Sequence, residues 1–159
     1  MSSTKRRPVI FTAQSKVFFY CRDAVCEFVF RQNAVPLNPF RVFEYFLGDR
    51  VDRDTVREGN NNLIRIVDEL WVFGEQIADG VLFEILFAKE LEKPVRYFTI
   101  HNRAEEIREI GIKNLTFEQE IYKAHGKRDR DAILSKILGY DVNVRQPEQL
   151  SLLLARDGE

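Results

Sequence analysis

The feature that most constrains the fold is a regular alternation, within residues 8–100, between short apolar segments and longer segments with helical periodicity. The short segments are rich in β-branched and aromatic residues, which is typical of buried strands. They are residues 8–13 (PVIFTA), 34–40 (AVPLNPF), 69–74 (ELWVFG) and 94–100 (PVRYFTI). The segments between them are expected to form helices at 15–32, at 53–68 and, after a loop at 74–80, up to residue 93.

Strands that alternate with helices predict an α/β fold with a parallel sheet covered on both faces. Right-handed crossovers make such a sheet doubly wound, in the Rossmann-like or flavodoxin-like manner. We expect the neighbour order 2-1-3-4, with room for a fifth element from the C-terminal region. The first strand should be central because residues 8–12 (PVIFT) form a short run without a charged residue. Trp71 should lie in the third strand and pack in the core.

Beyond residue 101 the sequence predicts a mostly helical extension of short amphipathic segments at 103–111, 116–126, 130–139 and 147–156. The sequence has no internal repeat and no obvious linker. It therefore predicts one domain over 1–159, with a core at about 8–100 and an extension at about 101–159. The last segment contains Leu150, Leu152, Leu153 and Leu154, which is too apolar for a free end. We therefore expect a homodimer or higher oligomer, formed by helices after residue 100 or by the helix at 53–68.

Composition excludes several classes of protein. The chain has 45% apolar and 31% charged residues, which is typical of a globular domain. Its net charge is −1, so it lacks the excess of positive charge that would attract nucleic acid or an anionic membrane. No apolar run reaches the length of a membrane span, and none follows the basic N-terminus as in a secretory signal.

The cysteines and histidines do not indicate a disulfide or a metal site. Cys21 and Cys26 are five residues apart in an expected helix and point to different faces, which indicates reduced cysteines and a cytoplasmic protein. His101 and His125 are too few for a zinc site, and we expect neither a metal nor a cofactor.

The fold class predicts where a ligand binds before any motif is considered. In doubly wound sheets, ligands bind beyond the carboxyl ends of the strands, near the switch in strand order. The relevant loops are TAQSK (12–16), NPF (38–40), GEQIADG (74–80) and HNR (101–103).

One carboxylate, Glu84, lies in the apolar part of the third expected helix. Its helical neighbours at three and four residues are Gly80, Val81, Phe87 and Ala88, none of them polar. The charged residues Lys89, Glu92 and Lys93 mark a different, solvent-facing stripe. Glu84 is thus expected to face the sheet or a cleft, where a carboxylate is costly unless it is paired or used. The structural alternative is a glutamate near the helix start that is stabilised by the helix dipole.

The residues around Glu84 carry a resemblance to a known family. DELWVFG (68–74) followed by ADGVLFEILFAKELEKPV (78–95) resembles the nucleoside 2-deoxyribosyltransferase family and its nucleotide N-glycosidase relatives. The shared pattern is an apolar strand, a glycine (Gly80) four residues before a glutamate (Glu84), then Ala88, and KPV at the next strand. The resemblance spans roughly residues 8–100 and is specific in its second half. The chain is also similar to a group of uncharacterised bacterial domains with CDELWVFG-like strands.

The resemblance implies a chemistry for Glu84. In those enzymes the matching glutamate attacks the anomeric carbon of a ribose or deoxyribose, the base leaves, and a glycosyl ester forms that water or another base resolves. The ligand would be a small-molecule nucleoside or nucleotide. The remaining expected contacts surround Glu84 at the carboxyl edge of the sheet: Thr12, Ala13 and Gln14, Asn38 and Phe40, Asn60, and Asp79 and Gly80.

Two departures from the family pattern keep a second function open. The family usually has an aspartate on the helix before the third strand, and the matching position here is Asn60, which cannot donate a proton as a carboxylic acid. The loop after the first strand is TAQSK, where the family often has Gly with Ser or Pro. The chain is therefore expected to be an N-glycosidase or deoxyribosyltransferase-like enzyme with Glu84 and Asn60 as catalytic residues. The alternative is a non-catalytic nucleotide-binding sensor or adaptor module.

Overall fold

A computed structural model of the chain describes residues 5–44, 50–124, 129–136 and 138–139. Its central sheet has four parallel strands, β1 (Val9–Gln14), β2 (Val35–Leu37), β3 (Glu69–Phe73) and β5 (Val95–Phe98). A fifth strand, β6 (Glu109–Ile110), pairs antiparallel with β5, and the full order is β2-β1-β3-β5-β6. The expected doubly wound fold is therefore confirmed, including the central first strand and the fifth element from beyond residue 100.

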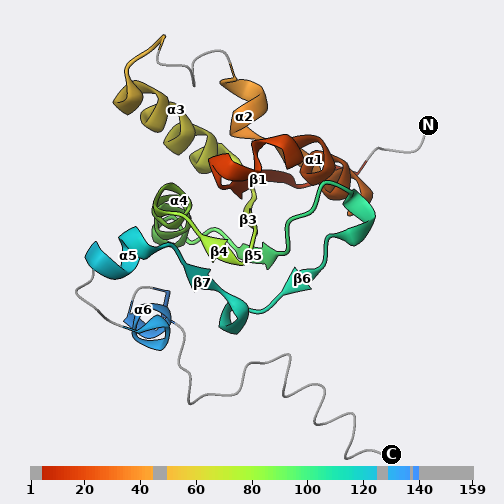
Figure 1. Cartoon of the computed structure of the whole chain (residues 1–159). Helices are drawn as coiled ribbons and strands as arrows, with labels where there is room; N and C mark the ends of the chain where they lie inside the picture. The colour runs from red at the N-terminus through yellow and green to blue at the C-terminus, as the bar shows by residue number, and fades with distance from the viewer. Residues whose placement is uncertain (1–4, 45–49, 125–128, 137, 140–159) are drawn as a thin grey trace, which may run out of the picture.

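Helices cover both faces of this sheet (Figure 1). One face carries the 3₁₀ helices η1 (Lys16–Cys21) and η3 (Ala104–Glu106) and the helix α1 (Arg22–Arg31). The other carries α3 (Arg53–Ile66), α4 (Asp79–Glu90), α5 (Gln119–Ala124) and α6 (Arg130–Lys136). A short α2 (Pro39–Val42) follows β2. Because side chains alternate along each strand, the sheet separates two apolar clusters, one under each helical layer.

The cluster on the α1 side is aromatic and contains Trp71, as expected. Trp71 is 2% exposed and packs with Phe28 and Phe98 at ring-centroid distances of 6.5 and 5.0 Å. Phe73 stacks on Phe98 at 5.1 Å. The tryptophan is thus a core residue in the third strand.

The region after residue 100 differs from the expected run of helices. Helices α5 and α6 confirm two of the expected segments, but residues 103–111 form η3 and the strand β6 instead of a helix. A further short strand, β7 (Thr116–Phe117), pairs in parallel with β4 (Gln76–Ile77), and η4 (Ile112–Asn114) precedes it. These segments are extended because β5 and β4 offer them backbone partners, a tertiary effect that overrides local periodicity. The expected helix at 147–156 lies outside the described residues.

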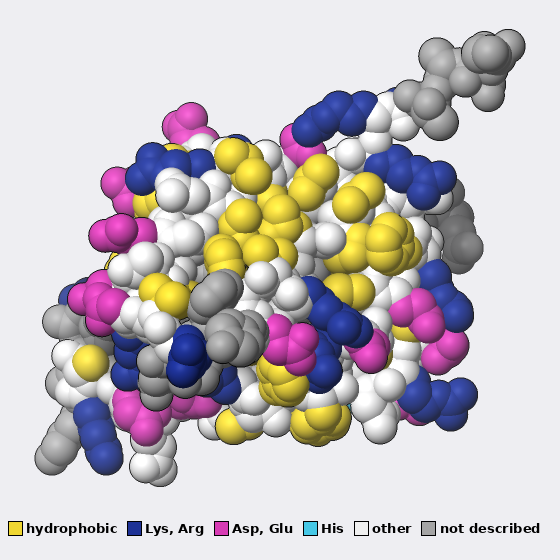
Figure 2. Space-filling model, turned by 90° about the horizontal axis from the view of Figure 1, so that it is seen from above, with side chains coloured by type: hydrophobic (Ala, Val, Ile, Leu, Met, Phe, Trp, Pro, Cys, Tyr) yellow, Lys and Arg dark blue, Asp and Glu magenta, His cyan; other side chains and the backbone are white. Residues whose placement is uncertain are grey.

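The side of the molecule that carries α1, α2 and α3 has an apolar surface (Figure 2). Hydrophobic side chains gather in the middle of this side, with Lys, Arg, Asp and Glu around them. Exposed apolar residues on the elements of this side include Val35, Val42 and Ile66, the last 69% exposed. None of the helices in the described residues combines the length and the apolar character that a membrane span needs.

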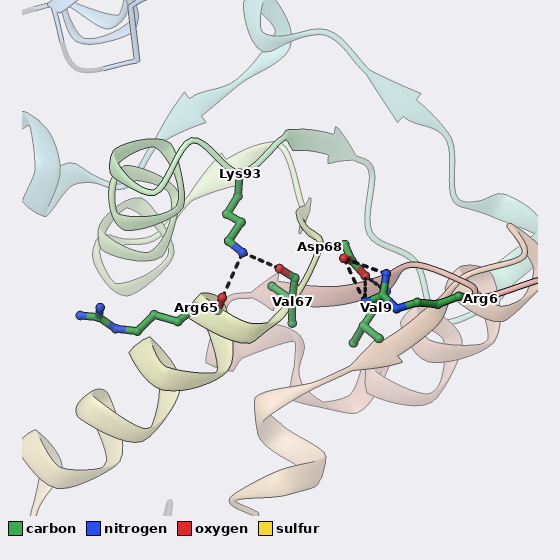
Figure 3. Close-up of polar contacts among 6 residues, drawn as sticks. All are labelled: Arg6, Val9, Arg65, Val67, Asp68 and Lys93. Carbon is green, nitrogen blue, oxygen red and sulfur yellow. Dashed lines mark hydrogen bonds and ion pairs between the residues drawn. The ribbon is translucent and has the colours of Figure 1, made fainter.

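Two polar junctions hold the amino-terminal edge of the sheet (Figure 3). Asp68 accepts hydrogen bonds from the Val9 N–H at 2.7 Å and from the Arg6 guanidinium at 3.1 Å, and these two donors lower the pKa of its carboxyl group. Lys93 Nζ donates to the carbonyl oxygens of Arg65 at 3.0 Å and Val67 at 2.8 Å. Lys93 therefore joins the end of α4 to the end of α3, which fixes how these two helices enter the adjacent strands.

Candidate functional site

Glu84 is one turn into α4, between the residues that pack on the sheet and those that face water. Val81, Ile85 and Ala88 are buried against the sheet, whereas Phe83 is 59% exposed. Glu84 itself is half-buried, and no described side chain forms a hydrogen bond or an ion pair with it. Desolvation by burial raises its pKa to about 8. The carboxyl group is thus mainly protonated at pH 7, and its ionised form is a poorly solvated carboxylate.

The first turn of α4, which precedes Glu84, is exposed. Gly80 is exposed, and a Cβ atom built on it would meet no heavy atom within 4 Å. Asp79, the first residue of α4, is also exposed. It lies near Glu118, whose pKa is raised by burial, by Glu120 and by Asp79. The first turn of α4 therefore has backbone N–H groups without an intrahelical partner and one carboxylate on an exposed surface.

The side chains of Thr12, Gln14 and Asn38, which were predicted to contact the ligand, form hydrogen bonds with one another. Asn38 Nδ2 donates to Thr12 Oγ1 at 2.9 Å and to Gln14 Oε1 at 3.0 Å, and Asn38 Oδ1 accepts from the Phe40 N–H at 2.9 Å. Gln14 Nε2 donates to the carbonyl oxygen of Phe18 at 2.8 Å. All three side chains are at most 5% exposed. The network joins the ends of β1 and β2 and shapes the loops that follow them.

Ala13 and Phe40 are core residues in this structure. Ala13 is fully buried in the cluster beneath α3 and α4. Phe40 is 7% exposed, and its ring packs edge-on against Phe19 at 5.4 Å. The Phe40 ring therefore contributes packing at the base of the loop after β2.

Asn60 lies on α3, the helix that packs beside α4. Its Oδ1 atom is buried and has no hydrogen-bond partner among the described residues. The next turn of α3 places Ile64 in the same apolar cluster as Val81 and Ile85 of α4. A buried carbonyl oxygen without a donor costs about 1–3 kcal/mol. Asn60 thus leaves an acceptor open on the helix next to that of Glu84.

Two features of this region were not expected from the sequence. The prediction that Lys89 and Lys93 face solvent is only partly right. Lys89 Nζ donates to the carbonyl oxygen of Leu138 at 2.5 Å, and Lys93 Nζ donates to that of Val67. Arg22, at the start of α1, lies over the Phe19 ring at 4.0 Å, and its buried Nε has no partner among the described residues. The sequence carries no signal for either arrangement, because an isolated Lys or Arg on a helix is most often solvated.

The comparisons with known proteins give a family and a distant structural likeness. The model of a family described as "Domain of unknown function (DUF7768)" matches residues 16–98, just over half of the chain. No curated protein matches the sequence of this chain. Among solved structures, a "2-desoxiribosyltransferase from Leishmania mexicana" is similar at 18% sequence identity and a TM-score of 0.47, with 77% of this chain and 88% of that chain covered. The match to the family model shows that this chain belongs to the DUF7768 family.

Proposed function

We propose that this protein binds a nucleoside or nucleotide and cleaves its base–sugar bond, with Glu84 as the nucleophile. The observation that carries the proposal is Glu84 itself: a half-buried carboxyl group, unpaired among the described residues, whose pKa is raised to about 8. A perturbed carboxyl group without a structural partner is a candidate for catalysis. Helix α4, which carries Glu84, follows β3 and β4, and this fold class binds ligands beyond the carboxyl ends of the strands. The sequence pattern around Gly80 and Glu84, which resembles that of nucleoside 2-deoxyribosyltransferases, supports the same chemistry.

In the proposed reaction an ionised Glu84 oxygen attacks the anomeric carbon of the sugar. A C–O ester bond forms, the C–N bond to the base breaks, and its electron pair leaves with the base. Water then attacks the same carbon and releases the carboxylate of Glu84, and the proton lost by that water balances the one taken up by the base. If a second base replaces water, the product is a new nucleoside.

The first turn of α4 is proposed to contact the ligand, because its residues Asp79 and Gly80 are exposed and precede Glu84 on the same helix. The backbone N–H groups at Asp79 and Gly80 suit a phosphate or a hydroxyl oxygen. Asn60 Oδ1 suits a hydroxyl or amino donor, and its carboxamide orients the ligand without supplying a proton. In this proposal Thr12, Gln14 and Asn38 act through the loop shapes that they hold. No metal or cofactor takes part in the proposed reaction.

A second candidate is a non-catalytic module that binds a nucleotide. Asn60 favours it, because a carboxamide stands where the resembling enzymes usually have a carboxylic acid. The raised pKa of Glu84 also favours it, since a protonated carboxyl group binds by hydrogen bonds but is not a nucleophile. Base release separates the two candidates, because a sensor binds its ligand without cleaving it.

The test is release of free base from a panel of nucleosides and nucleoside monophosphates, followed by chromatography. We expect Glu84→Gln to abolish base release while ligand affinity stays within about tenfold, since the neutral isostere keeps its shape but forms no ester. Glu90→Gln, on the exposed face of the same helix, is the matched control and should retain activity. Asn60→Asp should raise activity if the missing acid limits the rate. Full turnover by Glu84→Gln would exclude the catalytic proposal.

A further inference from the structure

The outward face of α4 has an apolar pair with no cover among the described residues. Phe83 is 59% exposed and Leu86 is 37% exposed, and they lie three residues apart on one side of the helix. Asp79 and Glu90 lie toward the two ends of the same exposed side. The pair is thus an apolar strip one turn long on an otherwise polar surface.

The described part of the chain ends beside the helix that carries this strip. Helix α6 packs on the same side of the sheet as α4 (Figure 1), with Ile133 and Leu134 in the core cluster that contains Val81 and Ile85. Two residues beyond α6, the carbonyl oxygen of Leu138 accepts a hydrogen bond from Lys89 Nζ of α4. Leu138 and Gly139, the last described residues, therefore end the described chain next to α4, and residues 140–159 lie outside the description.

We propose that the leucines of this C-terminal segment pack on Phe83 and Leu86. Leu150, Leu153 and Leu154 have the spacing of one face of a helix, after Pro147, which suits a helix start. The apolar side chains of two helices can pack against each other without any polar contact, and the three leucines would match Phe83 and Leu86 in this way. The occupant is thus residues 147–156 of the same chain.

The distances in the chain permit this contact. From Lys89 to Phe83 the helix spans about 9 Å at 1.5 Å per residue. The connection from Gly139 to Leu150 covers up to about 36 Å when extended. Because the two strips belong to one chain, a connection of this length gives an effective concentration of about millimolar, which favours the contact within one chain over a contact between chains. The proposal does not depend on the proposed function.

The test places a photoreactive p-benzoylphenylalanine at position 83 of the full-length protein. Equal amounts of ¹⁵N-labelled and unlabelled chains are mixed before irradiation, and the cross-linked peptides are identified by mass spectrometry. We expect cross-links from position 83 to residues 147–156, with both peptides carrying the same label. The same photoreactive residue at Tyr20, exposed on η1 at the other face of the sheet, is the control and should not reach that segment.

A pair of variants tests whether the leucines make the contact. Leu153→Asp combined with Leu154→Asp should lower the yield of this cross-link by about tenfold or more, because two charges replace the apolar strip. Arg156→Ala, in the same segment, should leave it unchanged. Cross-links only between differently labelled chains would overturn the proposal in favour of a second copy as the occupant. No cross-link to residues 147–156, or an unchanged yield in the leucine variant, would overturn it as well.

Discussion

The side chain of Asn38 donates a hydrogen bond to the hydroxyl oxygen of Thr12 at 2.9 Å, which ties the loop after β2 to the end of β1. Asn38 makes two further hydrogen bonds, to Gln14 Oε1 and from the Phe40 N–H, and is 2% exposed. Both loops lie at the edge of the sheet that this fold class uses for ligands. Their shape therefore depends on one buried carboxamide.

Replacing this carboxamide should destabilise the fold. We expect Asn38→Ala to lower the free energy of unfolding by about 2–4 kcal/mol, because it leaves buried polar groups without partners. Denaturant unfolding measures the change. Asn62→Ala, at an exposed position of α3, is the control and should change stability by at most about 0.5 kcal/mol. Equal effects of the two substitutions would mean that the network adds no stability.

Glu84 should make stability depend on pH. Its pKa in the fold, about 8, is above its ordinary value of 4.5, so the folded protein binds this proton more tightly than the unfolded chain. The stabilising effect of the proton is complete below about pH 4.5 and is lost as the pH rises toward 8. Glu84→Gln should therefore raise the melting temperature at pH 8 and have little effect at pH 4.5. A rise of the same size at both pH values would show that the carboxyl group titrates normally.

The same pKa predicts the pH dependence of base release. If the ionised carboxylate is the nucleophile, the rate should rise by about tenfold between pH 7 and pH 9, as the ionised fraction grows through a pKa of about 8. The measurement is the single-turnover rate of base release at saturating nucleoside. A rate that falls over this range would identify the protonated form of Glu84 as the active one, and would turn its role into that of an acid.

Lys93 should stabilise the junction of α3 and α4. We expect Lys93→Met to lower the free energy of unfolding by about 1–2 kcal/mol, because the carbonyl oxygens of Arg65 and Val67 lose a charged donor (Figure 3). Lys113→Met, at an exposed position, serves as the control in the same denaturant titration. If both variants unfold at the same denaturant concentration as the parent, Lys93 has no structural role.

Self-association is predicted to use the apolar side that carries α2 and α3 (Figure 2). We expect the protein to sediment as a dimer or larger oligomer at micromolar concentration, and Val42→Glu, at a 49% exposed position, to shift it toward the monomer. Asn114→Glu, at an exposed position of η4, introduces the same charge on another element and should leave the association unchanged. A monomeric parent protein would contradict this prediction.

Much of the fold was predictable from the sequence, because it follows from periodicity. The apolar runs and helical spacings of residues 8–100 correspond to β1, β2, β3 and β5 and to the helices between them. The central position of β1 and the burial of Trp71 followed from apolar character alone. These features are local or depend only on hydrophobic pattern, and such patterns survive in the tertiary structure.

Of the candidate site, the sequence indicated Glu84, since its helical neighbours left it no polar partner. It did not indicate that Thr12, Gln14 and Asn38 satisfy one another, because these residues are far apart in the chain and their mutual distances depend on the pairing of β1 with β2. The short strands β6 and β7 were also missed, since two residues carry no periodicity and are extended only because a partner strand is adjacent.

The sequence by itself thus determined the elements, their order in the sheet and the identity of one unusual carboxyl group. Only the tertiary structure decided which polar groups are already paired. Among the described residues it leaves the carboxyl group of Glu84, the Oδ1 atom of Asn60 and the Nε atom of Arg22 without a partner. The physical reason is that a hydrogen bond depends on distances of a few tenths of an ångström between groups that are remote in sequence. Desolvation likewise depends on everything packed around a group, and so the raised pKa of Glu84 arises from the fold as a whole.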